Sequence, residues 1–162
     1  MNIAAGIPCE RGKALGKFDP KEYLLKLMKE KFNGYICLTI AGEKGFEEAV
    51  LVFSDGKITC SDYEYFKFNR RFSAEEGLER SLNAFLAKSG VLDCFSLTPQ
   101  QVQLVMTLNE YAVLREPIDE HKLALPQSFI SDYEKEVAGE VEKTEETKAW
   151  FLKKYGLTKI MH

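Results

Sequence analysis

The sequence lacks any long hydrophobic run. Across its 162 residues no window holds 18 consecutive apolar residues, whereas a membrane-spanning helix needs about 20. The first 16 residues carry Glu10, Arg11 and Lys13 without an apolar core, so we expect no secretory signal peptide. Neither sign of charge dominates, with 22 Lys and Arg against 25 Asp and Glu, whereas a nucleic-acid-binding domain is usually strongly basic. The sequence therefore predicts a globular cytoplasmic protein with no transmembrane segment.

Residues spaced for metal binding are also missing. Zinc sites usually show a Cys-x-x-Cys pair, and this chain has none. The available ligands are Cys9, Cys37, Cys60, Cys94, His121 and His162. Three of the cysteines lie in apolar runs, and we expect them to be buried as small hydrophobic residues in a reducing compartment. The sequence thus predicts no metal and no cofactor.

Known catalytic motifs are absent as well. The chain has no G-x-S-x-G elbow, no Walker loop, no G-x-G-x-x-G and no H-E-x-x-H. His121 lies in a polar stretch without a neighbouring nucleophile, so we expect a surface histidine. Glu47 and Glu48 are adjacent and on a strand would point to opposite faces, which makes them a poor acid–base pair. We therefore predict no catalytic residue and a non-enzymatic protein.

Caps and turns predict an α+β domain over 18–130, after an irregular lead-in over 1–17. Asp19-Pro20 starts a helix that runs to about Phe32, with Phe18 and Tyr23 as a hydrophobic staple. Strands follow over 35–40 and 49–53, and a third ends near Tyr65. Asp55-Gly56 predicts a tight hairpin between the last two, because a type I′ turn needs positive φ angles. This hairpin would place Phe53 opposite Ile58, and Leu51 opposite Cys60.

A second helix is predicted from Ser73, with Glu76 completing an S-x-x-E capping box, to a stop at Gly90. A short strand follows over 91–97. The third helix begins at Thr98-Pro99 and runs to about Arg115, because Pro117 cannot continue it. Its apolar residues lie on more than one side, so this helix is either central or has a second buried contact. Together, the predicted helices and strands indicate an antiparallel three- to four-stranded meander sheet covered by helices.

The last part of the chain differs in charge. Residues 131–148 hold seven acids and three bases, which predicts a solvated linker or a solvent-facing helix. Residues 149–162 then form a short aromatic and basic helix. Such a helix is marginal alone. We expect it to dock on its own domain, on a sister subunit or in a partner groove.

Two short motifs carry a family resemblance. They are Lys31-Phe32-Asn33-Gly34-Tyr35 after the first helix and Asp55-Gly56-Lys57-Ile58 in the hairpin. In this order the chain resembles an uncharacterised archaeal domain-of-unknown-function family and, more weakly, PATAN-type regulatory domains, over roughly 18–115. The end, 151–157, is similar to a short tail of such archaeal proteins. The resemblance implies an α+β domain without a recognised catalytic site and with a role in regulation or protein association.

Two segments are candidate contact sites. The stretch 63–72 alternates aromatic and basic residues, and the C-terminal helix carries the only tryptophan. Aromatic and Arg side chains favour a protein partner or a homodimer. They also favour single-stranded nucleic acid, although residues 1–130 hold 16 bases against 18 acids. A third reading has the aromatics anchor the loop to the core. A small-ligand pocket is a further alternative. The candidate residues are Tyr65, Phe66, Lys67, Phe68, Arg70, Arg71, Phe72, Trp150, Phe151, Leu152 and Tyr155.

Overall fold

The computed structural model describes residues 1–154, without the side chains of Phe151 and Leu152. The chain divides into two compact units, Met1–Ile130 and Ser131–His162. Among the described residues the first unit is an α+β domain and the second holds one helix, α4 (Asp132–Lys154). None of the described helices is both long and apolar enough to cross a bilayer.

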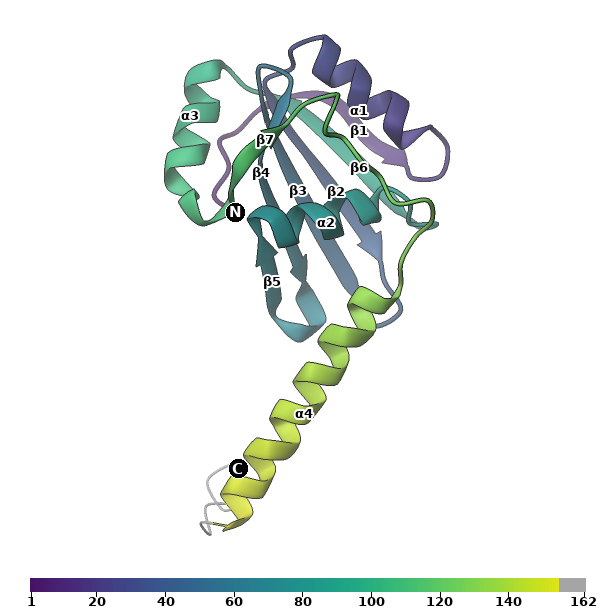
Figure 1. Ribbon diagram of the computed structural model, residues 1–162, viewed down its shortest axis with the longest axis vertical. Helices are drawn as coiled ribbons and strands as arrows, with labels where there is room; N and C mark the ends of the chain where they lie inside the picture. Colours follow the sequence, from purple (N-terminus) through teal and green to yellow (C-terminus); the bar gives the residue numbers. More distant parts are fainter. Residues whose placement is uncertain (155–162) are drawn as a thin grey trace. The chain divides into compact units, whose positions relative to one another are not determined.

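The domain is built on an antiparallel sheet of seven strands, counted over the described residues. Their order is β1-β6-β2-β3-β4-β5, and β7 also pairs with β4 (Figure 1). The predicted count of three to four strands is therefore wrong, although the β2-β3-β4 meander lies at the centre of the sheet. The bounds are β1 Ile7–Ala14, β2 Gly34–Ala41, β3 Phe46–Ser54, β4 Lys57–Tyr65, β5 Arg70–Ser73, β6 Gly90–Ser96 and β7 Val113–Ile118.

The β3–β4 hairpin follows its turn chemistry but not the whole predicted register. Asp55 and Gly56 both have positive φ, at 48° and 76°, and Phe53 lies opposite Ile58 as predicted. A register shift beyond this pair then brings Val52, not Leu51, opposite Cys60. The side chain of Cys60 therefore belongs to the same face as Val52.

Helices α1 (Pro20–Lys29) and α2 (Ala74–Ala84) cover one face of the sheet, where Ile36, Leu38 and Leu51 are buried. The Asp19 carboxylate caps α1 by accepting hydrogen bonds from two backbone amides, at 2.8 and 3.0 Å. The predicted staple is confirmed, since the ring centroids of Phe18 and Tyr23 are 5.3 Å apart. The helix ends at Lys29, one turn before the predicted end.

The predicted capping box of α2 is wrong. Ser73 is the N-cap residue, but its side chain makes no capping hydrogen bond. Its hydroxyl instead donates to Oδ1 of Asp62 on β4, at 2.7 Å. This bond orients the hydroxyl toward a buried carboxylate on the neighbouring strand rather than toward the helix amides. Helix α2 ends at Ala84, before the predicted stop at Gly90.

Helix α3 (Pro99–Leu108) covers part of the opposite face. The capping box of Thr98 and Gln101 is present. The helix ends at Leu108, so the predicted continuation to Arg115 is wrong: a 3-10 turn, η2 (Glu110–Ala112), leads into β7. Under α3 lies a second core, made of Val50, Val52, Cys60, Leu97, Val102, Val105 and Ala112.

Regular structure extends into the first and last segments of residues 1–154. The lead-in over 1–17 was expected to be irregular but contains β1, which pairs with β6 through two register shifts. Helix α4 runs without a break through the acidic stretch 131–148 and into the aromatic and basic segment. The acidic stretch is therefore a helix, one of the two alternatives that its composition left open.

Candidate functional site

The stretch 63–72 folds into a tight hairpin. Tyr65 ends β4, Phe66–Phe68 form the 3-10 turn η1, and Asn69 takes the left-handed conformation with φ 48°. β5 then returns along β4, with Arg70 opposite Tyr65 and Arg71 opposite Glu64. This return divides the segment between a face packed under α2 and a face open to solvent.

The aromatic side chains of this hairpin have different surroundings. Tyr65 is buried, and its ring meets that of Phe72 edge-on at 5.9 Å. The guanidinium of Arg80 from α2 lies 3.6 Å from the centroid of the Phe72 ring. Phe68 is half-buried, and Phe66 is 49% exposed. The structure thus places Tyr65 and Phe72 in the packing of the domain and leaves Phe66 most accessible.

The basic side chains are also not equivalent. Arg71 donates to the Glu64 carboxylate at 2.5 Å, and its Nε lies 3.6 Å from Oδ2 of Asp62. The hydrogen bond to Glu64 raises the pKa of Arg71 above its ordinary value, while burial opposes this and the Asp62 carboxylate adds to it. Lys67 and Arg70 are exposed. Two carboxylates therefore compensate the charge of Arg71, which fixes its guanidinium at the edge of the sheet.

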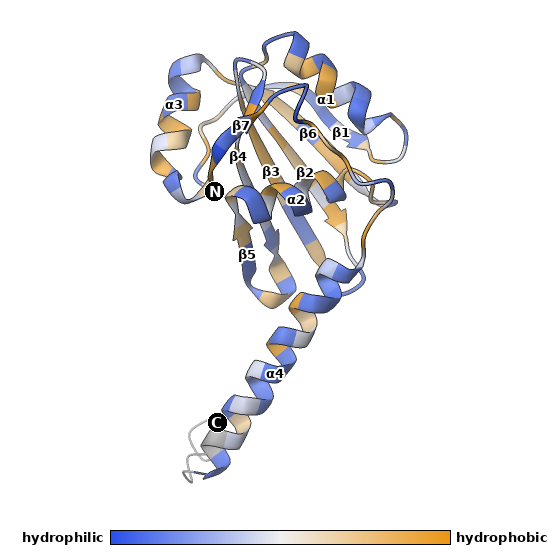
Figure 2. Cartoon of the chain, in the orientation of Figure 1, coloured by the Kyte–Doolittle hydropathy of each residue, from blue (hydrophilic) through white to orange (hydrophobic). Residues whose placement is uncertain are grey.

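A surface that the sequence analysis did not include among the candidate sites lies on α3. Leu104, Leu108 and Tyr111 are 52%, 55% and 51% exposed. Leu104 and Leu108 are four residues apart and so lie on one side of α3, and Tyr111 follows in η2. The opposite side of α3 buries Val102 and Val105 in the second core. No residue of α3 is charged. In Figure 2 the apolar residues of α3 appear in orange between its blue polar residues. One signal for this surface is present in the sequence, because the apolar residues of the predicted third helix lie on more than one side.

Asn109 holds the end of this stripe in place. Its side chain is fully buried, and its Nδ2 donates to the backbone oxygens of Asn2 at 2.7 Å and Val105 at 2.6 Å. Its Oδ1 accepts from the backbone amide of Asn2 at 2.7 Å and from the Tyr111 hydroxyl at 3.3 Å. One amide group thus ties the chain start, the end of α3 and the tyrosine together.

Tyr111 also connects the stripe to β5. Partial burial raises the pKa of Tyr111, and the Asp62 carboxylate adds to this, whereas the neighbouring Arg71 opposes it. The phenol therefore lies close to the guanidinium of Arg71. We define the α3 surface as Leu104, Leu108, Tyr111 and Arg71. It joins a residue of the predicted contact segment to three residues that the prediction left out.

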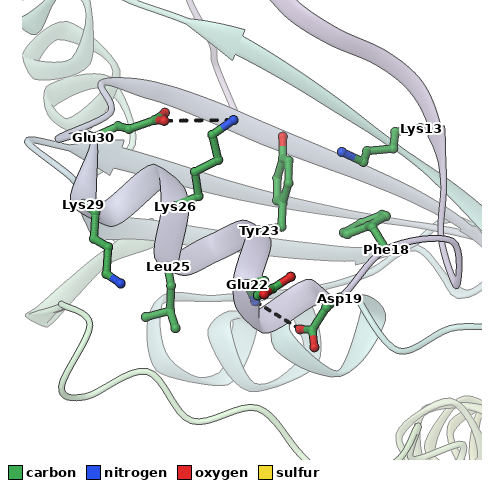
Figure 3. A pocket seen from close by; sticks show the side chains of 9 residues that line it. All are labelled: Lys13, Phe18, Asp19, Glu22, Tyr23, Leu25, Lys26, Lys29 and Glu30. Atoms are coloured by element: carbon green, nitrogen blue, oxygen red, sulfur yellow. Dashed lines mark hydrogen bonds and ion pairs between the residues drawn. The ribbon is translucent and has the colours of Figure 1, made fainter.

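A groove of about 600 Å³ runs along α1, on the other face of the domain (Figure 3). Nζ of Lys13 donates to Glu10 at 2.8 Å and lies 4.9 and 4.6 Å from the ring centroids of Phe18 and Tyr23. Burial raises the pKa of Tyr23 above its usual range, and contacts with Glu10 and Cys94 add to this. The groove is open and carries both signs of charge. Its polar centre was missed because Glu10 and Lys13 belong to the supposed irregular lead-in.

The C-terminal candidates lie in the second unit. Trp150 is 55% exposed, and Nζ of Lys154 lies 4.6 Å from the centroid of its ring. Phe151 and Leu152 belong to α4. Tyr155 lies outside the described residues, and its role stays a prediction. The described residues contain no group of three His, Cys, Asp or Glu side chains placed to hold a metal ion.

Comparison with known proteins gives one match. No curated protein and no solved structure matches the chain. A family model matches residues 1–109, which include the sheet except β7 and all of α3. This confirms the archaeal resemblance, while the PATAN-type resemblance stays a prediction. The chain belongs to the family DUF2226, described as an uncharacterized protein conserved in archaea.

Proposed function

We propose that this protein is a non-catalytic, cytoplasmic association module with a regulatory role, and that the α3 surface is its contact with a protein partner. A second copy of the chain is the partner that this surface fits best. The observation that carries the proposal is the apolar stripe of Leu104 and Leu108 on a helix without any charged residue.

The composition of the surface suits a protein contact. Burial of apolar area is worth roughly 25 cal/mol per Å², and half of each leucine is still exposed to water. Tyr and Arg are the residues most enriched where binding energy concentrates, and Tyr111 and Arg71 lie at the end of the stripe. Arg71 is already held by Glu64, so binding orders one fewer side chain.

The absence of charge on α3 favours a second copy over a charged partner. In a two-fold interface the same patch meets itself, so a charge close to the two-fold axis would face its own copy. A helix of uncharged residues avoids this repulsion and leaves no buried charge without a partner. Arg71 is the one charged residue of the α3 surface, and Glu64 and Asp62 already compensate its charge, so α3 can meet its own copy without repulsion.

The alternatives have less support. A platform for single-stranded nucleic acid needs successive accessible rings, but Tyr65 and Phe72 pack inside the domain and Arg71 is compensated by carboxylates. A small-ligand site is usually a cleft that encloses most of its ligand. The α1 groove is open along its length, so we rank ligand binding lower.

The test is a matched pair of variants of the full chain. Leu104→Glu and Gln103→Glu each add one negative charge to exposed neighbours on the same helix. We expect the unaltered chain to form a dimer in sedimentation velocity over a concentration series. Leu104→Glu weakens this dimer by roughly tenfold or more, because losing a central contact costs at least about 1.4 kcal/mol. Gln103→Glu changes it little.

Two results would overturn the proposal. One is a wild-type chain that stays monomeric at all concentrations and also captures no protein through the α3 surface. The other is salt-dependent binding of an oligonucleotide that Phe66→Ala and Arg70→Ala remove, which would favour the nucleic-acid function. Trp150→Ala, measured in the same dimer assay, tests whether α4 contributes, as the sequence predicts.

A further inference from the structure

The pairing of β1 with β6 brings two cysteines together. Pro8 lies opposite Phe95, and Glu10 lies opposite Cys94, so Cys9 is an extra residue between two neighbouring pairs. Where one strand has an extra residue, two of its residues oppose a single residue of the partner strand. Cys9 and Glu10 therefore share the position across from Cys94.

The two thiols have contrasting access to solvent. Cys9 is exposed, and its Sγ lies 3.7 Å from the backbone oxygen of Ile7. Cys94 is 1% exposed and lies beneath the hydroxyl of Tyr23. Burial raises the pKa of the Cys94 thiol to about 12, and the Cys9 side chain, in direct contact with it, adds to this shift.

We propose that Cys9 and Cys94 form an oxidation site, at which hydrogen peroxide converts the two thiols into an intrachain disulfide between β1 and β6. The Cys9 sulfur attacks one peroxide oxygen, the O–O bond breaks, and Cys9 sulfenic acid and one water form. The Cys94 sulfur then attacks the Cys9 sulfur, the S–O bond breaks, and a second water leaves. Two thiols lose two electrons and two protons, and one peroxide is reduced to two waters.

The backbone is suited to this bond. Glu10, the chain neighbour of Cys9, faces Cys94, and facing residues of an antiparallel pair have Cα atoms about 4.5–5.5 Å apart. Disulfides span Cα separations of up to about 6.8 Å, which leaves reach for the adjacent extra residue. The exposed thiol is the one that meets peroxide first, and the buried one is the resolving partner. The second step needs the Cys94 thiolate, so we expect closure of the disulfide to be slow near neutral pH and to speed up as pH rises.

The other two cysteines are internal controls. Cys60 is buried in the second core. Cys37 lies on the same face as Cys60, and its thiol, like that of Cys94, has a raised pKa of about 12, mainly through burial and then the Glu48 carboxylate. Neither of these thiols has a cysteine across from it, since Cys37 faces Val50 and Asp93, and Cys60 faces Val52 and Val113.

The test treats the full chain with hydrogen peroxide, alkylates the remaining thiols and digests with trypsin. The four cysteines fall in four different tryptic peptides, 1–11, 32–44, 58–67 and 89–115. We expect a cross-linked product of 1–11 with 89–115, two hydrogens lighter than the separate peptides, from a chain that remains monomeric in non-reducing gels. Cys37→Ser leaves this product unchanged, and Cys9→Ser removes it.

The first step has its own readout. In Cys94→Ser the sulfenic acid has no resolving partner, so dimedone should label Cys9. The proposal is overturned if all four thiols survive peroxide, if the cross-link joins Cys9 to another copy of the chain, or if Cys9→Ser leaves the loss of Cys94 unchanged. The site lies apart from α3, so the dimer experiment and this one fail or succeed separately.

Discussion

The hydroxyl of Ser61 on β4 and the hydroxyl of Ser81 on α2 share a hydrogen bond of 3.0 Å, and both side chains are fully buried. This polar pair lies within an apolar layer between helix and sheet. Sliding α2 along the strands would leave both hydroxyls without a partner, which is costly in an apolar environment. The pair therefore fixes the position of α2 over the sheet.

Removing both of these hydroxyls is expected to cost less than the sum of the costs of removing each one alone. Ser81→Ala leaves the Ser61 hydroxyl buried and unsatisfied, with a loss of about 1–3 kcal/mol in the free energy of unfolding. The double variant Ser61→Ala/Ser81→Ala should be closer to the wild type than the sum of the single variants. Urea unfolding of all four proteins measures this coupling, and simple additivity would contradict it.

Gly77 sets how closely α2 approaches the sheet edge. A Cβ at this position would lie 2.7 Å from the backbone oxygen of Phe72 and 3.2 Å from that of Ser61. Since backbone atoms cannot rotate away, Gly77→Ala should lower the free energy of unfolding by about 1–3 kcal/mol, the usual cost of overpacking.

Gly139 provides the matched control for this substitution. It is also a helical glycine, but a Cβ there would meet nothing within 4 Å. Gly139→Ala should raise the stability of α4 by about 0.5–1 kcal/mol, because alanine loses less entropy in a helix. Thermal unfolding followed by circular dichroism compares the two variants, and a Gly77→Ala variant as stable as the wild type would contradict the close contact.

Glu10 makes the domain sensitive to acid at the α1 groove. Burial alone would raise the pKa of this carboxyl, but hydrogen bonds from Lys13 and Tyr23 outweigh burial and hold the pKa below its ordinary 4.5. A carboxyl with a lowered pKa in the folded state stabilises the fold above the unfolded-state pKa. This contribution is lost as the pH falls below about 4.5 and through the folded-state pKa.

Lys13→Met should therefore move the pKa of Glu10 upward. Carboxyl-carbon NMR titration measures this shift directly, and Lys21→Met, which removes an exposed lysine from α1, serves as the control. A Glu10 pKa that is the same in both variants would show that the ion pair does not determine its titration.

The features that the sequence predicted correctly are those that depend on neighbouring residues. Asp19 followed by Pro20 defines the start of α1, and Asp55-Gly56 defines the hairpin, because caps and turns involve residues only a few positions apart. Thr98 and Gln101 likewise form their box within one helical turn.

The features that it missed depend on distant partners. β1 is irregular in sequence and becomes a strand because β6, some 80 residues later, offers it hydrogen bonds. Ser73 makes no capping bond because its hydroxyl is oriented toward the buried Asp62 carboxylate, to which it donates. The same limit applies to the site: the apolar excess of α3 was visible, but which of its sides remains exposed depends on what the sheet covers.

The two borders of the sheet have one further consequence. On one side, the outer edge of β4 is divided between β7, beside Ile58, and β5, beside Tyr65. On the other side, β1 is interrupted by two register shifts. A long, regular border would act as a template on which strands of other chains could polymerise. Both borders of this sheet are broken, which protects the domain against fibre growth when it is crowded.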